Sequence, residues 1–241
     1  MEIFNKDYYI GIGEVDCALQ CKPYFILHFL QDAATLHSEM LGFSRDQMIE
    51  KCGGVFILTK LFYRLDKPVS YKQTLTVKTW HRGLERLLWY RDFQLFADGQ
   101  PVGVASSAWV LLNPETKRIL RPREFENLNF PCADRFENKL EIPKITHDMT
   151  GADKTNLTVQ YSQIDINNHV NNTKYIEICQ DALNPADFAD MYVSEAVINY
   201  QKELRYGENF DVYALREVDT VHFSAQNTEN KFEARVRFEK L

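Results

Sequence analysis

Three polar side chains that suit a hydrolytic site lie close together in segment 162–183. Asp165, Asn167 and His169 are spaced two residues apart, immediately before a stretch with helical periodicity. In an extended segment this spacing places all three side chains on one face. The carboxylate can orient water or the imidazole, the amide can donate to a carbonyl oxygen, and N–H groups at a helix start favour developing negative charge. The pattern indicates attack on a carbonyl group.

The same residues also suit simpler roles, because Asn and Asp are common in turns and helix caps. A calcium-binding loop is excluded. Counted from Asp165, the sixth position is Val170 and the twelfth is Ile176, where such a loop needs glycine and glutamate. The sequence has no GxSxG elbow, glycine-rich phosphate loop or HExxH motif. It implies no metal and no organic cofactor.

The elements that must position these residues form a pattern that occurs twice. In the first half a helical stretch begins at Pro23 and ends before Gly42, and strand patterns follow at 55–65, 74–81, 87–97 and 101–112. In the second half a short strand at 156–161 precedes a helical stretch at 173–183, and strand patterns follow at 193–203, 209–217, 220–227 and 231–239. Gln-Asp-Ala takes matching places in both helices, at 31–33 and 180–182. The order predicts a tandem α+β repeat.

The segment DINNHVNNTKYIE at 165–177 closely resembles the D-x-N-x-H-V-N-N-x-x-Y-I signature of the acyl-ACP thioesterases, the plant plastid fatty-acyl thioesterases and their bacterial relatives. The resemblance implies a tandem double hotdog, each unit a long central helix wrapped by a curled antiparallel β-sheet. It also implies hydrolysis of fatty acyl-[acyl-carrier-protein] to free fatty acid and holo-ACP. The expected units are an N-terminal hotdog at 1–125, a linker at 126–155 and a catalytic C-terminal hotdog at 156–241.

The family signature continues in a later strand with a tyrosine, two mostly basic residues, a glutamate and a cysteine. The matching segment begins at Tyr200, and Glu203 takes the place of the catalytic glutamate. Leu204 replaces the cysteine, so a thiol nucleophile at that place is impossible. We therefore expect hydrolysis in which Asn167 holds the carbonyl, while Asp165, His169 and Glu203 position and deprotonate the attacking species. Whether Glu203 activates water or attacks the carbonyl itself stays open.

The first half has no counterpart of this constellation, because Ala18 aligns with Asn167 and Gln20 with His169. We expect the first half to hold the acyl chain beneath its helix. The candidate lining residues are Ile26, Phe29, Leu30 and Met40. Acyl carrier protein is acidic, so basic residues should gather near the mouth of the site. The candidate docking residues are Lys117, Arg118, Arg121 and Arg123 in one cluster, and Lys174, Lys202 and Arg205 near the catalytic segments.

Composition limits the remaining functions. The chain has 241 residues and a formal net charge of −6, a poor basis for general binding of nucleic acid. Five cysteines without a CxxC pair indicate reduced thiols in the cytoplasm, not a zinc site or a disulfide framework. No apolar stretch approaches the length that crosses a bilayer, and the N-terminus has no signal-peptide pattern. A homodimer stays open, because a tandem repeat supplies its own pseudo-dimer.

Three other functions compete with acyl-ACP hydrolysis. An acyl-CoA thioesterase on the same scaffold would use the same catalytic segment. A non-catalytic protein that binds acyl groups would have no need of Asp165, Asn167, His169 and Glu203 together. A hotdog dehydratase would use a different histidine and acid, and the sequence has no GHFPG-like segment.

Overall fold

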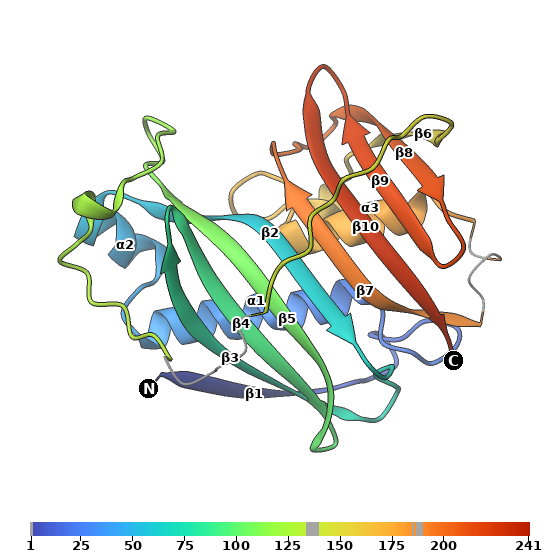
Figure 1. Ribbon diagram of the computed structural model, residues 1–241, viewed down its shortest axis with the longest axis horizontal. Helices are drawn as coiled ribbons and strands as arrows, with labels where there is room; N and C mark the ends of the chain where they lie inside the picture. Colours follow the sequence, from blue (N-terminus) through green and yellow to red (C-terminus); the bar gives the residue numbers. More distant parts are fainter. Residues whose placement is uncertain (1, 134–139, 185, 187–189) are drawn as a thin grey trace.

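Ten strands form one antiparallel sheet in the computed structural model, which describes residues 2–133, 140–184, 186 and 190–241 (Figure 1). The strand order is β1-β3-β4-β5-β2-β7-β10-β9-β8-β6. The strands of the first half are β1 (Ile3–Tyr9), β2 (Val55–Leu65), β3 (Thr74–Glu85), β4 (Leu88–Ala97) and β5 (Gln100–Leu112). Those of the second half are β6 (Asp153–Thr158), β7 (Met191–Tyr200), β8 (Asn209–Arg216), β9 (Thr220–Gln226) and β10 (Asn230–Lys240).

The sheet repeats its own order about a central seam. The order β1-β3-β4-β5-β2 of the first half matches β6-β8-β9-β10-β7 of the second. The seam is the antiparallel pair β2 and β7, in register from Lys60 opposite Asn199 to Arg64 opposite Glu195. The predicted tandem repeat is confirmed, and the two halves share one continuous sheet.

Helix α1 (Pro23–Met40) lies against one face of the first half (Figure 1). Proline at its first position needs no N–H partner and presets the helical backbone. The helix ends at Met40, Leu41 is its C-cap, and Gly42 follows in the left-handed region with φ 79°. Ile26, Leu30 and Ala33 on its buried face belong to a core that also includes Ile198 and Phe223 of the second half.

The helix of the second half is shorter than the long central helix that the sequence predicted. A 3-10 turn, η3 (Asn172–Lys174), precedes α3 (Tyr175–Asp181). The Asn171 side chain accepts from the Thr173 N–H at 2.9 Å, which caps the turn. Residues 182 and 183 are not helical. They lie close to Pro185 in the sequence, and a proline disfavours helical backbone in the residue before it.

Two elements of the first half were missing from the prediction. Strand β1 pairs with β3 at the edge of the sheet. Helix α2 (Arg45–Cys52) begins with a capping box, in which Ser44 and Gln47 bond each other's backbone N–H, and ends at Gly53 with φ 67°. The predicted hairpin at Asp98 and Gly99 is present, and both residues have the positive φ that a type I′ turn requires.

The connection between the halves contains no helix or strand in its described parts, 126–133 and 140–152. Its first part is anchored by Phe130, whose ring lies 4.2 Å from that of Phe43 and 4.3 Å from that of Trp89. Its second part crosses the sheet face opposite α1 and α3 (Figure 1). Strand β6 begins at Asp153, inside the range expected for the linker.

No helix in the described residues is both long and apolar enough to cross a membrane.

Candidate active site

The loop that carries the signature is a tight turn, not the extended segment that the spacing predicted. A bridge between Ile164 and Val170 closes it, and the Asp165 N–H donates to the His169 carbonyl at 2.8 Å. The Asn168 N–H donates to the Asp165 carbonyl at 3.0 Å, with Asn168 in the left-handed region at φ 64°. Asparagine tolerates that conformation better than most residues.

Within the turn the Asp165 carboxylate is committed to Asn167. One carboxylate oxygen accepts from the Asn167 backbone N–H at 2.8 Å, and the other accepts from its Nδ2 at 3.4 Å. An amide that donates one hydrogen to a fixed carboxylate keeps its second hydrogen for another acceptor. Asp165 thus orients the Asn167 amide at the exposed tip of the loop.

Glu203 lies beside this loop, in the connection between β7 and β8. The Val170 N–H donates to the Leu204 carbonyl at 2.8 Å, which ties the two segments together. As a result the His169 Nε2 lies 3.8 Å from the Glu203 Oε1. Partial burial acts to raise the pKa of Glu203, but its own backbone N–H, the His169 imidazole and the Arg205 guanidinium outweigh that and hold the pKa below its usual range. Glu203 is therefore a carboxylate at neutral pH.

The first half has a loop of the same shape without these side chains. A bridge between Val15 and Cys21 closes it, and the Asp16 N–H donates to the Gln20 carbonyl at 2.9 Å. The Asp16 carboxylate accepts from the Ala18 N–H at 2.9 Å, as Asp165 does from Asn167. Leu19 has φ 60°, in the place of Asn168. The repeat has kept the turn and its aspartate and has replaced the amide and the imidazole.

The neighbouring segment of the first half also lacks the glutamate. The Cys21 N–H donates to the Val69 carbonyl at 2.7 Å, the bond that corresponds to Val170 with Leu204. Pro68 therefore stands where Glu203 stands in the second half. The predicted catalytic residues come together once, in the second half.

An open groove of about 560 Å³ borders Glu203. The side chains of Lys202, Arg205 and Lys231 line it together with Glu208 and Glu229. Lys231 is 5% exposed and its Nζ lies 2.7 Å from a Glu208 carboxylate oxygen. Sequence reasoning missed Lys231 and Glu208, because only the fold brings β10 to the β7–β8 connection.

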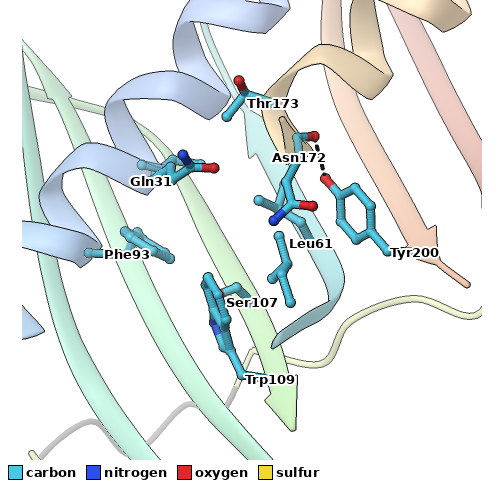
Figure 2. Close-up of a pocket in the computed structure, with 11 residues that line it drawn as sticks. Gln31, Leu61, Phe93, Ser107, Trp109, Asn172, Thr173 and Tyr200 are labelled. Carbon is cyan, nitrogen blue, oxygen red and sulfur yellow. Dashed lines mark hydrogen bonds between the residues drawn. The ribbon is translucent and has the colours of Figure 1, made fainter. Parts of the chain in front are cut away.

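A narrow apolar pocket lies between α1, the sheet and the turn that precedes α3 (Figure 2). Its volume is about 10 Å³, so its side chains leave little empty space. The first half contributes Leu30, Gln31, Ala34, Leu58, Leu61, Phe93, Ser107 and Trp109, and the second half contributes Asn172, Thr173 and Tyr200. The Tyr200 hydroxyl donates to the Asn172 carbonyl at 2.9 Å. Asn172 and Tyr200 each lie three residues along the sequence from a predicted catalytic residue, His169 and Glu203.

The residues predicted to line an acyl pocket have different environments. Leu30 lines the pocket of Figure 2. Ile26 is buried in the core, and the Phe29 ring stacks on Tyr8 with centroids 4.4 Å apart. The expectation for Met40 was wrong. Its side chain is 61% exposed in the last turn of α1, where the helix extends past the apolar face that the spacing suggested.

The predicted basic clusters lie in two regions. Lys117, Arg118, Arg121 and Arg123 are exposed in the segment after β5, and Arg118 is paired with Glu124 at 2.5 Å. In the second cluster, Lys202 and Arg205 line the groove beside Glu203. Lys174 is paired with Glu177 at 2.8 Å and lies over the Tyr24 ring. Arg118 and Lys174 thus already have partners within the chain.

A continuous sheet of two repeated helix-and-sheet units defines a double-hotdog protein, and within the described residues one loop carries the aspartate, the asparagine amide and the imidazole together. This chain belongs to the acyl-ACP thioesterase family. The family's "Acyl-ACP thioesterase N-terminal domain" matches residues 1–125, and its "Acyl-ACP thioesterase C-terminal domain" matches residues 146–240. The predicted family and double-hotdog fold are confirmed.

The individual proteins to which this chain is similar include plant and bacterial thioesterases. The palmitoyl-acyl carrier protein thioesterase of Cuphea hookeriana is 23% identical over 216 residues, which are 83% of this chain and 52% of that protein. The chain thus spans about half the length of such curated relatives. An acyl-ACP thioesterase structure from Bacteroides thetaiotaomicron superposes with a TM-score of 0.84 at 23% identity, covering 99% of this chain and 98% of the other. The 12:0-ACP thioesterase of Umbellularia californica gives a TM-score of 0.83 at 18% identity, covering 100% and 98%.

Proposed function

We propose that this protein hydrolyses fatty acyl-[acyl-carrier-protein] thioesters to free fatty acid and holo-ACP. The observation that carries the proposal is the Glu203 carboxylate, which lies 3.8 Å from the imidazole of His169, a residue of the same loop as the Asn167 amide that Asp165 orients. Family membership supports the same reaction.

In the proposed mechanism, the free hydrogen of the Asn167 amide donates to the thioester carbonyl oxygen and stabilises negative charge as it develops there. Glu203 takes a proton from water, and the water oxygen attacks the carbonyl carbon. The carbon–sulfur bond then breaks, and His169 in its protonated form supplies the proton to the departing thiolate. The proton held by Glu203 then passes to His169, 3.8 Å away, which restores both groups. The products are a carboxylic acid and a free thiol. Asp165 acts through Asn167 and is a positioning residue.

The acyl chain would occupy the pocket of Figure 2 after its walls separate, because the present volume cannot hold it. A cluster of buried polar groups lies farther along β4 from Phe93. Arg91 points to the same face of the sheet and donates to the His37 Nδ1 at 3.0 Å and to the Ser38 Oγ at 2.9 Å. Burial lowers the pKa of Arg91 to about 9. An alkyl chain gains nothing from contact with such groups, so they would mark the far end of the pocket.

The proposed partner is acyl carrier protein, an acidic protein, and the proposed contacts are Lys202 and Arg205 at the groove together with the cluster after β5. An acyl-CoA substrate is the alternative that the same site would serve. The odd cysteine count without a CxxC pair supports a cytoplasmic location as part of this proposal.

The test is release of free fatty acid from acyl-ACPs of graded chain length by the wild-type protein, Asp165→Ala and His169→Ala. We expect hydrolysis by the wild type and strong loss in both variants. Hydrolysis of acyl-CoA alone would favour the alternative substrate, and no hydrolysis of either thioester by the folded protein would contradict the proposed function.

The choice between direct attack by water and attack by Glu203 has its own measurement. A single turnover in water labelled with oxygen-18 places label only in the fatty acid if water attacks directly. Label in the Glu203 carboxylate would instead mean that the side chain had formed an anhydride.

A further inference from the structure

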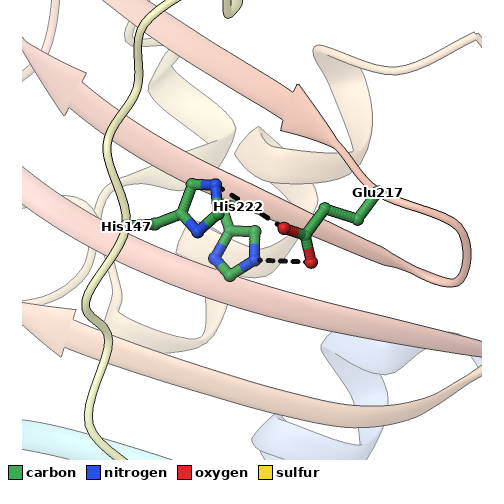
Figure 3. A group of neighbouring side chains, drawn as sticks. All are labelled: His147, Glu217 and His222. Atoms are coloured by element: carbon green, nitrogen blue, oxygen red, sulfur yellow. Dashed lines mark ion pairs between the residues drawn. The ribbon is translucent and has the colours of Figure 1, made fainter.

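A second cluster of titratable side chains lies where the linker crosses the second half of the sheet. His147 comes from segment 140–152, Glu217 from the turn after β8, and His222 from β9. Within the described residues, one nitrogen or oxygen atom from each of the three lies within 4.8 Å of the other two. Figure 3 shows the Glu217 carboxylate reaching both imidazole rings.

His222 is buried on the outer face of the sheet. Side chains alternate along a strand, and Val221 and Phe223 point into the core, so His222 points away from it. It is nevertheless 8% exposed. The His147 ring of the linker stacks on it, with centroids 3.9 Å apart and planes 13° from parallel. The fold thus brings two imidazoles together from segments far apart in the sequence.

The distances to Glu217 suit a shared ion better than hydrogen bonds. The His147 Nε2 lies 3.7 Å from one carboxylate oxygen, and the His222 Nε2 lies 3.5 Å from the other. Ligand atoms at about 2.0–2.1 Å from a tetrahedral zinc ion are separated by about 3.3–3.4 Å. The His222 Nδ1 is buried and has no hydrogen-bond partner in the described part of the chain. The polar partner of this ring is therefore Glu217, which faces its Nε2.

One ring must turn before both can bind one ion. The lone pair of an imidazole nitrogen lies in the ring plane, and two stacked planes do not meet at a common point. His222 is fixed within β9, whereas His147 lies on an irregular segment with 26% of its side chain exposed. Rotation about the side-chain bonds of His147 can aim its nitrogen at the position beside Glu217.

We propose that His147, Glu217 and His222 bind a divalent ion of the zinc type, which fastens the linker to the outer face of the second half. Two imidazoles and one carboxylate form the nitrogen and oxygen donor set that zinc accepts, with water in the fourth position. Arg235, opposite His222 on β10, has its guanidinium engaged by Glu195, which reduces its repulsion of an ion. The site shares no residue with the proposed active site.

The test is a zinc titration of the full chain in competition with a chromogenic chelator at neutral pH. We expect one ion per chain in the wild type, and His147→Ala and Glu217→Gln each to weaken binding by at least about tenfold. His28→Ala is the matched control, because His28 is an exposed histidine on α1 outside the cluster and its loss should leave the affinity unchanged. Equal affinity in the wild type and His147→Ala, or no saturable binding, would overturn the proposal.

Two further measurements separate this site from cysteine ligation and from a loose surface contact. Cobalt bound here should show visible bands of tetrahedral coordination without the intense near-ultraviolet band of a thiolate ligand, and such a band would place the ion elsewhere. Zinc should also slow tryptic cleavage after Lys144, on the linker, in the wild type but not in His147→Ala. Unchanged cleavage with bound zinc would contradict the fastening role.

Discussion

The residues of the proposed site have two kinds of role. Some would contact the substrate, and others hold those contacting residues in position. Asp16 and Asp165 make the same bond to the backbone two residues on, at 2.9 and 2.8 Å. Because the first half keeps this bond with Ala18 in the place of Asn167 and Gln20 in the place of His169, the aspartate serves the turn in both halves. Only in the second half does it also orient an amide, so the catalytic difference between the halves lies in Asn167, His169 and Glu203.

This division predicts different outcomes for the two aspartates. Asp165→Ala should lower kcat/KM for acyl-ACP by about 10²–10³, because Asn167 loses its orientation and with it the stabilisation of the oxyanion. Asn167→Ala should cost a similar factor, and the double variant little more than either alone. Asp16→Ala removes the matching bond and should leave kcat unchanged. Additive losses in the double variant would show that Asp165 acts independently of Asn167.

Glu203→Gln keeps the shape of the side chain and removes its basicity. We expect kcat to fall by about 10²–10⁴, the usual contribution of a general base, with the unfolding midpoint unchanged. Since the pKa of Glu203 is held below its usual range, its loss of charge should contribute no fall in kcat between pH 5 and 8. A variant of near wild-type activity would remove Glu203 from the mechanism.

We expect the ion pair of Lys231 and Glu208 to stabilise the folded protein. Glu208→Gln should destabilise the protein by about 1–3 kcal/mol, because it leaves a buried ammonium group without its 2.7 Å partner. Burial opposes the charge of Glu208, but Lys231 and the backbone of Arg205 hold its pKa below the usual range. Its contribution is therefore present above the unfolded pKa and is lost as pH falls through the lower folded value. Glu124→Gln, in an exposed pair, is the control and should change chemical unfolding less.

At the scale of elements, α1 and the strands beneath it form the walls of the proposed acyl pocket. Ala34 and Leu30 face the pocket from one side of the helix, and Phe93 faces it from β4. Met40, about two and a half turns farther along the helix from Gln31, is outside it. If the proposed pocket holds the acyl chain, one face of the helix should influence chain length and its C-terminal end should not.

Substitutions on α1 test this. Ala34→Phe should shift the preferred acyl-ACP by two or more carbons toward shorter chains, because each excluded methylene forfeits about 0.8 kcal/mol of burial. Met40→Phe adds bulk on the same helix at an exposed position and should leave the chain-length profile unchanged. Free fatty acid is measured over a graded acyl-ACP panel. An unchanged profile in Ala34→Phe would place the acyl chain elsewhere.

Elements with strong local signals could be predicted from the sequence. Pro23 and Gly42 bracket α1, and a run rich in β-branched and aromatic residues after Gly53-Gly54 gave β2 its bounds at Val55–Leu65. The half-exposed edge strand β1 has no such contrast, and α2 was missed although Ser44, Gln47 and Gly53 signalled it. The signature placed Asp165 and His169 together, but the turn that does so depends on bonds that spacing alone cannot reveal. The cluster of His147 with His222 depends on how the linker crosses the sheet, which no local pattern encodes.

At the scale of the whole molecule, the core passes through the β2–β7 seam without a break. Residues of α1, β2, β7 and β9 belong to one cluster, so neither half buries its apolar surface alone. Trp80, Trp89 and Trp109 are the three tryptophans, and all of them lie in the first half. Their fluorescence reports on that half, while circular dichroism reports on both.

We therefore predict that a core substitution in the second half moves the unfolding of the first. Phe223→Leu, which leaves a small cavity, should destabilise the protein by about 1–2 kcal/mol. The midpoint should fall by about 2–4 °C per kcal/mol, equally for tryptophan fluorescence and far-ultraviolet circular dichroism. A shift in dichroism with unchanged fluorescence would mean that the halves unfold separately.

The presence of both sides of the seam in one chain also changes how it assembles. Two separate hotdog chains would meet in a bimolecular step and part on dilution, whereas a tether keeps the two surfaces at an effective concentration on the order of millimolar. The pairing of β2 with β7 is therefore insensitive to how much protein the cell makes. In a tandem repeat the two halves are also encoded separately, so their sequences can diverge from each other, which two copies of one chain cannot do. One half can keep the residues of the proposed reactive loop while the other half changes its residues to suit a hydrocarbon chain.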